Sequence, residues 1–189
     1  MSKKTFFKIR LYSTVFVALV MWLLLIYQYY DAGVQRHYIL HREDLPSFSN
    51  WWGGVLLPIL TWFLVSRIQK RISTELQTPN FSANILYAFT SALLFGIILS
   101  IFFTFGYTEL PLYMIIGLFI CAIFLPIYRA ECFLGFVAGM TFTFGGVLPI
   151  LIVSVLTLIG ALLHFIFRPV IRFAIVQITN LTTSKEDDI

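Results

Sequence analysis

The sequence predicts an all-α polytopic membrane protein with six transmembrane helices and both termini in the cytoplasm. Apolar residues make up 59% of its 189 residues and charged residues only 12%, against roughly half and about a quarter in soluble domains. Long stretches of the chain carry no charge, and most of the basic residues gather on one side of these stretches. A soluble fold of this size could not bury so much apolar surface.

Five stretches without Asp, Glu, Lys or Arg are candidate spans, because a transmembrane helix needs about 20 predominantly apolar residues. They cover residues 11–30, 51–66, 84–105, 112–128 and 133–167. Basic residues precede the first stretch as they would in a signal peptide, but it is long and ends in Tyr-Gln-Tyr-Tyr-Asp without a small-residue cleavage pattern. We therefore expect a retained first helix.

The last stretch decides the number of helices. As one straight helix it would reach roughly 50 Å, well beyond a hydrocarbon core of about 30 Å. Gly145, Gly146 and Pro149 weaken the helical backbone in its middle. We expect the chain to turn there, with helices over 131–144 and 147–167, the first of them short.

The positions of Lys and Arg favour this turn. With six helices, eleven basic residues lie on one side and two, Arg36 and Arg42, on the other. The alternative, five helices with a long broken last helix and an outside C-terminus, divides them eight to five. The basic side should be the cytoplasm, which predicts a bacterial inner membrane protein and leaves the positive charge no role with nucleic acid.

The predicted organisation is then one membrane domain between two short polar ends. Residues 1–10 form a basic cytoplasmic N-terminus, 11–168 the transmembrane domain and 31–50 an outer loop. Residues 169–189 form an amphipathic segment and a polar tail.

A short sequence recurs at two of the helix starts. Gly-Gly-Val-Leu-Leu-Pro-Ile-Leu begins at Gly53, and the same run with one leucine fewer begins at Gly145. Paired Gly/Pro interruptions are typical of discontinuous helices beside a solute path, although chance recurrence among a few apolar letters is the alternative. The hinge or ligand-path candidates are Gly53, Gly54, Pro58, Gly145, Gly146 and Pro149.

Small residues mark two packing stripes, since close helix approach in lipid depends on small side chains. In the third predicted helix, small residues recur at every fourth position: Ala88, Ala92, Gly96 and Ser100. In the fifth predicted helix, the stripe consists of Gly135 and Gly139. We expect packing within the chain, with a homo-oligomer or a membrane-protein partner as the alternative.

The outer segment from His37 to Gly54 is the one stretch of the chain where histidine, arginine and acidic residues lie close together. In a helix, His37 and His41 would share a face and could reach one metal ion, but Asp44 would be too far from His37 for all three to bind it. A metal would need His41 with His37 or Asp44, and a further ligand from elsewhere. His41, Glu43 and Asp44 are the catalytic candidates if the protein is an enzyme. A polar lid resting on the bilayer explains more of the residues, so we predict no metal and no cofactor.

Ionisable residues at membrane depth are default functional candidates, and within the predicted spans only His164 stands out. We expect its side chain to snorkel toward the membrane surface or to bond a neighbouring carbonyl, with a proton relay as the alternative. Glu131 is expected in the interface, so the lack of buried carboxylates argues against an ion pump. Cys121 and Cys132 lack C-x-x-C spacing and are expected as small buried hydrophobes.

Three functional hypotheses follow. We favour a solute-binding or transport-related component for a neutral or amphiphilic small molecule, because the paired backbone breaks are the least ordinary feature. The second hypothesis is an enzyme acting on a lipid or lipid-linked substrate through the outer loop. The third is an accessory subunit of a larger membrane complex.

Overall fold

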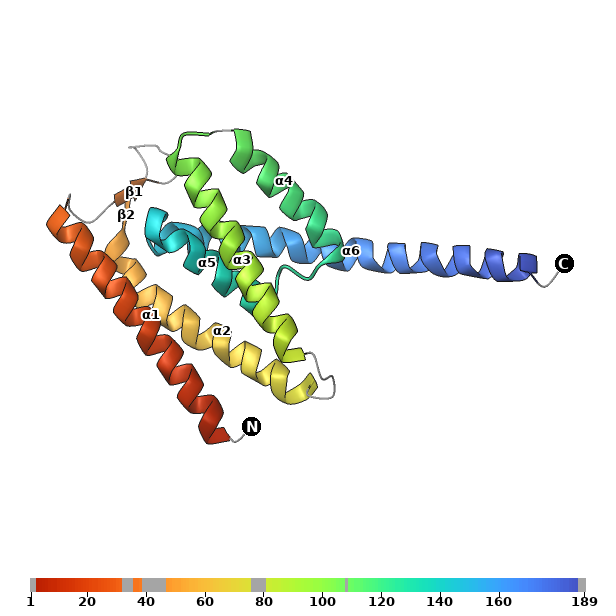
Figure 1. Ribbon diagram of the computed structural model, residues 1–189, viewed down its shortest axis with the longest axis horizontal. Coiled ribbons are helices and arrows are strands. Elements are labelled where there is room, and N and C mark those ends of the chain that lie inside the picture. Colours follow the sequence, from red (N-terminus) through yellow and green to blue (C-terminus); the bar gives the residue numbers. More distant parts are fainter. Residues whose placement is uncertain (1–2, 32–35, 39–46, 76–80, 108, 187–189) are drawn as a thin grey trace.

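The computed structural model describes residues 3–31, 36–38, 47–75, 81–107 and 109–186, and six α-helices dominate them (Figure 1). The helices are α1 (Lys3–Asp31), α2 (Gly53–Glu75), α3 (Phe81–Thr104), α4 (Glu109–Phe124), α5 (Ala130–Phe144) and α6 (Val147–Glu186). Two short strands, β1 (Arg36–Tyr38) and β2 (Ser47–Ser49), and the 3₁₀-helix η2 (Asn50–Trp52) connect α1 to α2.

Helices α1 and α2 form an antiparallel pair (Figure 1). Near the N-terminus, the Arg10 guanidinium lies 4.0 Å from the Trp62 ring centroid and donates a 3.1 Å hydrogen bond to the Ser66 hydroxyl. At the other end, Met21 and Leu25 are almost fully buried against the start of α2. The rest of α1 keeps large apolar side chains exposed, including Phe16, Leu19 and Leu23.

Helices α3 and α5 make the closest pairing in the bundle. A Cβ atom added at Gly139 would overlap the carbonyl oxygen of Leu93, and one added at Gly96 would lie 2.8 Å from the carbonyl oxygen of Phe136. Because glycine has no side chain, the two backbones approach within contact distance. This pairing buries α5 in the middle of the molecule.

Helices α5 and α6 are separated at the point where the sequence predicts a turn. Gly145 has a φ of 72°, a conformation that residues with a Cβ rarely adopt, and α6 begins two residues later. Pro149 lies in the first turn of α6, where its missing N–H costs no helical hydrogen bond. Helix α6 continues through Pro169, beyond the predicted end of the span at 167, and its C-terminal part projects from the bundle (Figure 1).

Four helices of the described residues are long and apolar enough to cross a membrane: 4–30, 50–74, 83–104 and 147–170. Helices α4 and α5 are apolar but shorter. The structure therefore agrees with the predicted all-α class, and its long apolar helices are compatible with an integral membrane protein.

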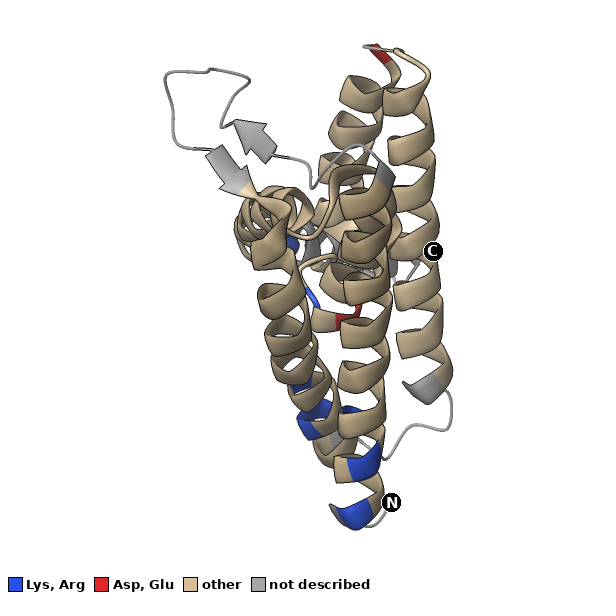
Figure 2. Ribbon diagram, turned by 90° about the vertical axis from the view of Figure 1, so that its left-hand side faces the viewer, with Lys and Arg blue, Asp and Glu red and all other residues tan. Residues whose placement is uncertain are grey.

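Most of the basic residues coloured in Figure 2 lie toward one end of the bundle. Lys4, Lys8 and Arg10 lie near the start of α1, and Arg67, Lys70 and Arg71 lie near the end of α2. Glu109 lies at the opposite end, at the turn between α3 and α4. We refer to these as the basic end and the outer end.

The connection between α1 and α2 contains a β ladder where a helix was considered. Strands β1 and β2 pair antiparallel, with His37 opposite Phe48. The helical spacing that would place His37 and His41 on one face therefore does not apply at His37. His41, Glu43 and Asp44 lie outside the described residues.

Candidate functional site

A buried polar cluster joins three parts of the chain at the outer end. The Asn50 side chain donates a 3.0 Å hydrogen bond to Gln28 Oε1 and accepts a 2.8 Å hydrogen bond from the backbone N–H of Gly146. Asn50 is 1% exposed. One side chain thereby links the end of α1, the start of the α2 segment and the turn before α6.

The glycines of the two recurring runs meet at this cluster. A Cβ at Gly146 would lie 2.8 Å from the Gly53 Cα, and a Cβ at Gly145 would overlap the Asn50 side chain. Gly54 faces Leu25 of α1, while Pro58 lies inside α2. The hinge candidates are thus brought into a close-packed joint, and neither of the two cavities described below is lined by them.

The two predicted packing stripes lie against each other. A Cβ at Gly135 would lie 3.2 Å from the Ala92 Cβ and would overlap the carbonyl oxygen of Phe89. Gly139 approaches Gly96 in the same way. Ala88 and Ser100 extend the α3 stripe on either side, and Ser100 is buried. This face of α3 is occupied by α5.

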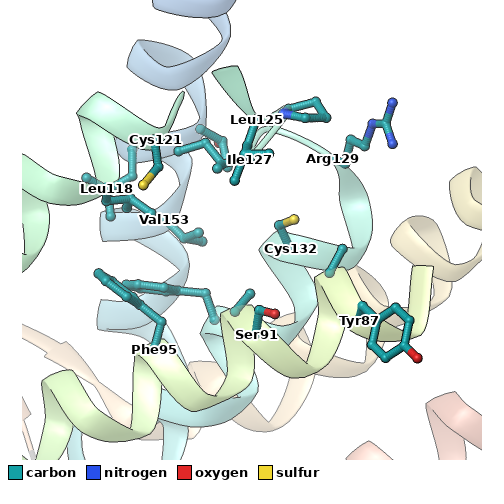
Figure 3. A pocket seen from close by; sticks show the side chains of 16 residues that line it. Tyr87, Ser91, Phe95, Leu118, Cys121, Leu125, Ile127, Arg129, Cys132 and Val153 are labelled. Atoms are coloured by element: carbon teal, nitrogen blue, oxygen red, sulfur yellow. The ribbon is translucent and has the colours of Figure 1, made fainter. Parts of the chain in front are cut away.

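A cavity of about 400 Å³ lies between α3, α4, α5 and α6 (Figure 3). Its lining residues on α3 and α5 lie mostly in the first half of each helix, and those on α4 lie in the second half. Helix α4 packs mainly on α6 and makes few contacts with α3, which leaves this space between them. Its walls are mostly apolar and come from all four helices: Phe95, Leu118, Phe136, Val153 and Leu156, with the thiols of Cys121 and Cys132 and the hydroxyls of Ser91 and Thr157.

The cavity opens along α3 and α4. Ser91, Cys121 and Leu125 line it and are exposed at the molecular surface. Tyr87 and Arg129 lie at its rim, with their polar ends turned away from the interior (Figure 3). The expectation that both cysteines are buried is therefore wrong for Cys121, because the gap between α3 and α4 exposes it.

A buried ion pair was not expected from the sequence. Glu131, in the first turn of α5, is 1% exposed, and its Oε1 atom lies 2.7 Å from Arg71 Nη2 of α2. Its Oε2 atom has no hydrogen-bond partner among the described residues. The prediction of a bundle without a buried carboxylate is wrong here, because Arg71 is 60 positions away in the sequence and folding brings it to Glu131.

His164, on α6, is also buried, at 2% exposure. Its Nδ1 atom lies 3.3 Å from the carbonyl oxygen of Ala122, and its Nε2 atom lies 3.4 Å from Arg168 Nη1. The ring also packs 5.4 Å from the Tyr128 ring. This is the carbonyl contact expected from the sequence, and it holds α6 against the end of α4.

The polar side chains do not assemble a metal centre within the part of the chain that the structure describes: no group of three His, Cys, Asp or Glu residues has suitable geometry there. Several described hydroxyls in the helices bond to a carbonyl one turn back, as Thr61 does to Leu57 and Thr141 to Val137. Two sites remain as candidates: the apolar cavity, and a second hollow lined by basic residues between the end of α2 and the start of α5.

Comparison of the chain with protein-family models, curated proteins and solved structures gives no match.

Proposed function

We propose that the protein is an integral membrane protein that binds a neutral or amphiphilic small molecule in the cavity between α3, α4, α5 and α6. In this proposal all six helices cross the bilayer, the basic end faces the cytoplasm and both termini lie there, as in a bacterial inner membrane. A role in transport or capture of the molecule follows from the same site.

The observation that carries the proposal is the cavity itself. Its volume of about 400 Å³ falls within the range of small-molecule sites, which are mostly apolar with a few polar groups. It opens between α3 and α4 onto a surface of exposed apolar side chains, such as Leu86, Leu94 and Ile120. In a bilayer that surface faces lipid, so an apolar molecule can enter sideways without crossing water.

The charge distribution supports the orientation. Basic residues near membrane spans remain on the cytoplasmic side, and most of the Lys and Arg residues coloured in Figure 2 gather toward one end of the bundle. The two shorter helices complete the six crossings, α5 enclosed among the other helices and α4 at the periphery with exposed side chains along its length.

Native mass spectrometry of gently extracted protein tests the proposal, with metal analysis on the same sample. We expect a bound small molecule on the wild-type chain and little metal. Ser91→Trp should fill the cavity and remove the molecule, because Ser91 lines the cavity at its exposed edge. Ser154→Trp is the matched control, since Ser154 is exposed on α6 and does not line the cavity.

Two results would contradict the proposal. A bare wild-type chain would remove its support, and retention of the molecule by a folded Ser91→Trp variant would place the binding site elsewhere. About one metal ion per chain would instead favour the enzyme hypothesis and direct attention to His41, Glu43 and Asp44.

A further inference from the structure

A second hollow, of about 550 Å³, lies between the end of α2 and the start of α5. We call it the basic groove, because four basic side chains line it together with a single carboxylate: Arg67, Lys70, Arg71, Arg129 and Glu131. Lys70 and Arg71 follow Arg67 by three and four positions on α2, so both lie on the same face of the helix as Arg67. Arg129, immediately before α5, completes the set from the opposite wall.

The single carboxylate does not neutralise the groove. Glu131 already pairs with Arg71 at 2.7 Å. Arg67, Lys70 and Arg129 make no ion pair with any residue that the structure describes, and Arg67 and Lys70 are exposed. The groove therefore presents three positive charges in excess of its carboxylate.

Apolar side chains line the groove together with the basic ones. They belong to Phe63, Leu64, Ile68 and Phe133, and Phe63 is 52% exposed. The Arg67 guanidinium lies 5.0 Å from the Phe63 ring centroid. Positive charge beside an exposed apolar side chain matches a molecule with an anionic head and an apolar chain better than it matches a free anion.

We propose that the basic groove binds the phosphate headgroup of an anionic phospholipid. Basic pockets between transmembrane helices on the cytoplasmic side are suited to such headgroups. In this assignment Arg67, Lys70 and Arg129 contact the phosphate, while Glu131 holds Arg71 in place beside it. This site is separate from the cavity of the proposed function, and the two share only Arg129 at their rims.

The test measures lipid selectivity by native mass spectrometry, with phosphatidylglycerol and phosphatidylcholine of identical chains added in equal amounts. We expect the wild-type chain to retain phosphatidylglycerol preferentially. Arg67→Gln with Arg129→Gln should reduce that preference by about fivefold for each side chain removed, the contribution of one basic residue near an anionic surface. Lys70→Gln alone provides a milder variant if the double variant does not fold.

A charge-matched control separates the groove from a general effect of positive charge. Lys8→Gln with Arg168→Gln removes two basic residues from outside the groove and should keep the preference. Ser91→Trp should keep it as well, because that change fills only the apolar cavity.

Four results would overturn the assignment. Equal retention of the two lipids, or an equal loss of preference in the charge-matched control, would show that the groove has no selectivity of its own. Release of phosphatidylglycerol by millimolar inorganic phosphate would identify a free-anion site. Loss of the preference in Ser91→Trp would place the lipid in the cavity instead.

Discussion

Single residues determine how distant parts of this chain meet, and Asn50 is the clearest case. Its amide contacts Gln28, 22 positions earlier, and the Gly146 backbone, 96 positions later. Sequence patterns relate residues that are close along the chain, so the buried role of Asn50 was not predicted. The same limit applies to Arg71 and Glu131, whose pairing no local spacing indicates.

We expect Asn50→Ala to destabilise the fold by about 2 kcal/mol or more, because it leaves a buried acceptor at Gln28 and a buried N–H at Gly146 without their partner. Equilibrium unfolding in mixed micelles measures the change. Ser49→Ala is the control: its hydroxyl makes only a 3.5 Å exposed contact with Trp51, so its effect should be below about 0.5 kcal/mol. Similar unfolding curves for the two variants would contradict the buried role of Asn50.

At the scale of elements, the sequence predicts best where backbone chemistry is local. Gly145 and Gly146 predict the break between α5 and α6, and uncharged stretches predict the long helices. The small-residue periodicity identifies faces that approach other helices, but it does not identify the partner, and folding pairs the α3 stripe with α5. The basic groove and the cavity are formed by residues from several helices, so no local sequence motif predicts them.

The same substitution in two helices tests this pairing. Gly139→Ala should destabilise by about 1–3 kcal/mol, because its methyl group would overlap the Leu93 carbonyl oxygen and push α3 from α5. Gly117→Ala meets nothing within 4 Å and should stabilise α4 by about 0.5–1 kcal/mol through helix propensity.

Unfolding of both variants under one condition gives the comparison. The changes in the free energy of unfolding of the two variants should have opposite signs. A neutral or stabilising Gly139→Ala would mean that α3 and α5 are not in backbone contact.

At the scale of the whole molecule, the outstanding property is the separation of charge between the two ends. It predicts orientation, and a C-terminal reporter distinguishes six crossings from five. Green fluorescent protein fused after Ile189 should fluoresce, while alkaline phosphatase at the same position should remain inactive, because the first matures in the cytoplasm and the second requires an oxidising compartment.

Cysteine labelling in a Cys121→Ala, Cys132→Ala background provides the control for both ends. Glu109→Cys should react with an impermeant maleimide in intact spheroplasts, and Thr74→Cys only after the membrane is opened. Active phosphatase at the C-terminus together with unchanged labelling at these two positions would establish the five-helix alternative.

The brevity of α5 affects how the protein meets a bilayer. Fifteen residues rise only about 22 Å, short of a hydrocarbon core of about 30 Å. A lipid-facing helix of that length would thin the membrane around itself. Helix α5 is instead enclosed, with Gly135, Phe136, Val137, Gly139 and Met140 all buried. In the proposed arrangement lipid meets α4 instead, whose 16 residues rise only about 24 Å and whose Leu112, Ile116 and Ile120 are exposed. Any thinning of the bilayer is therefore expected beside α4 and not beside α5.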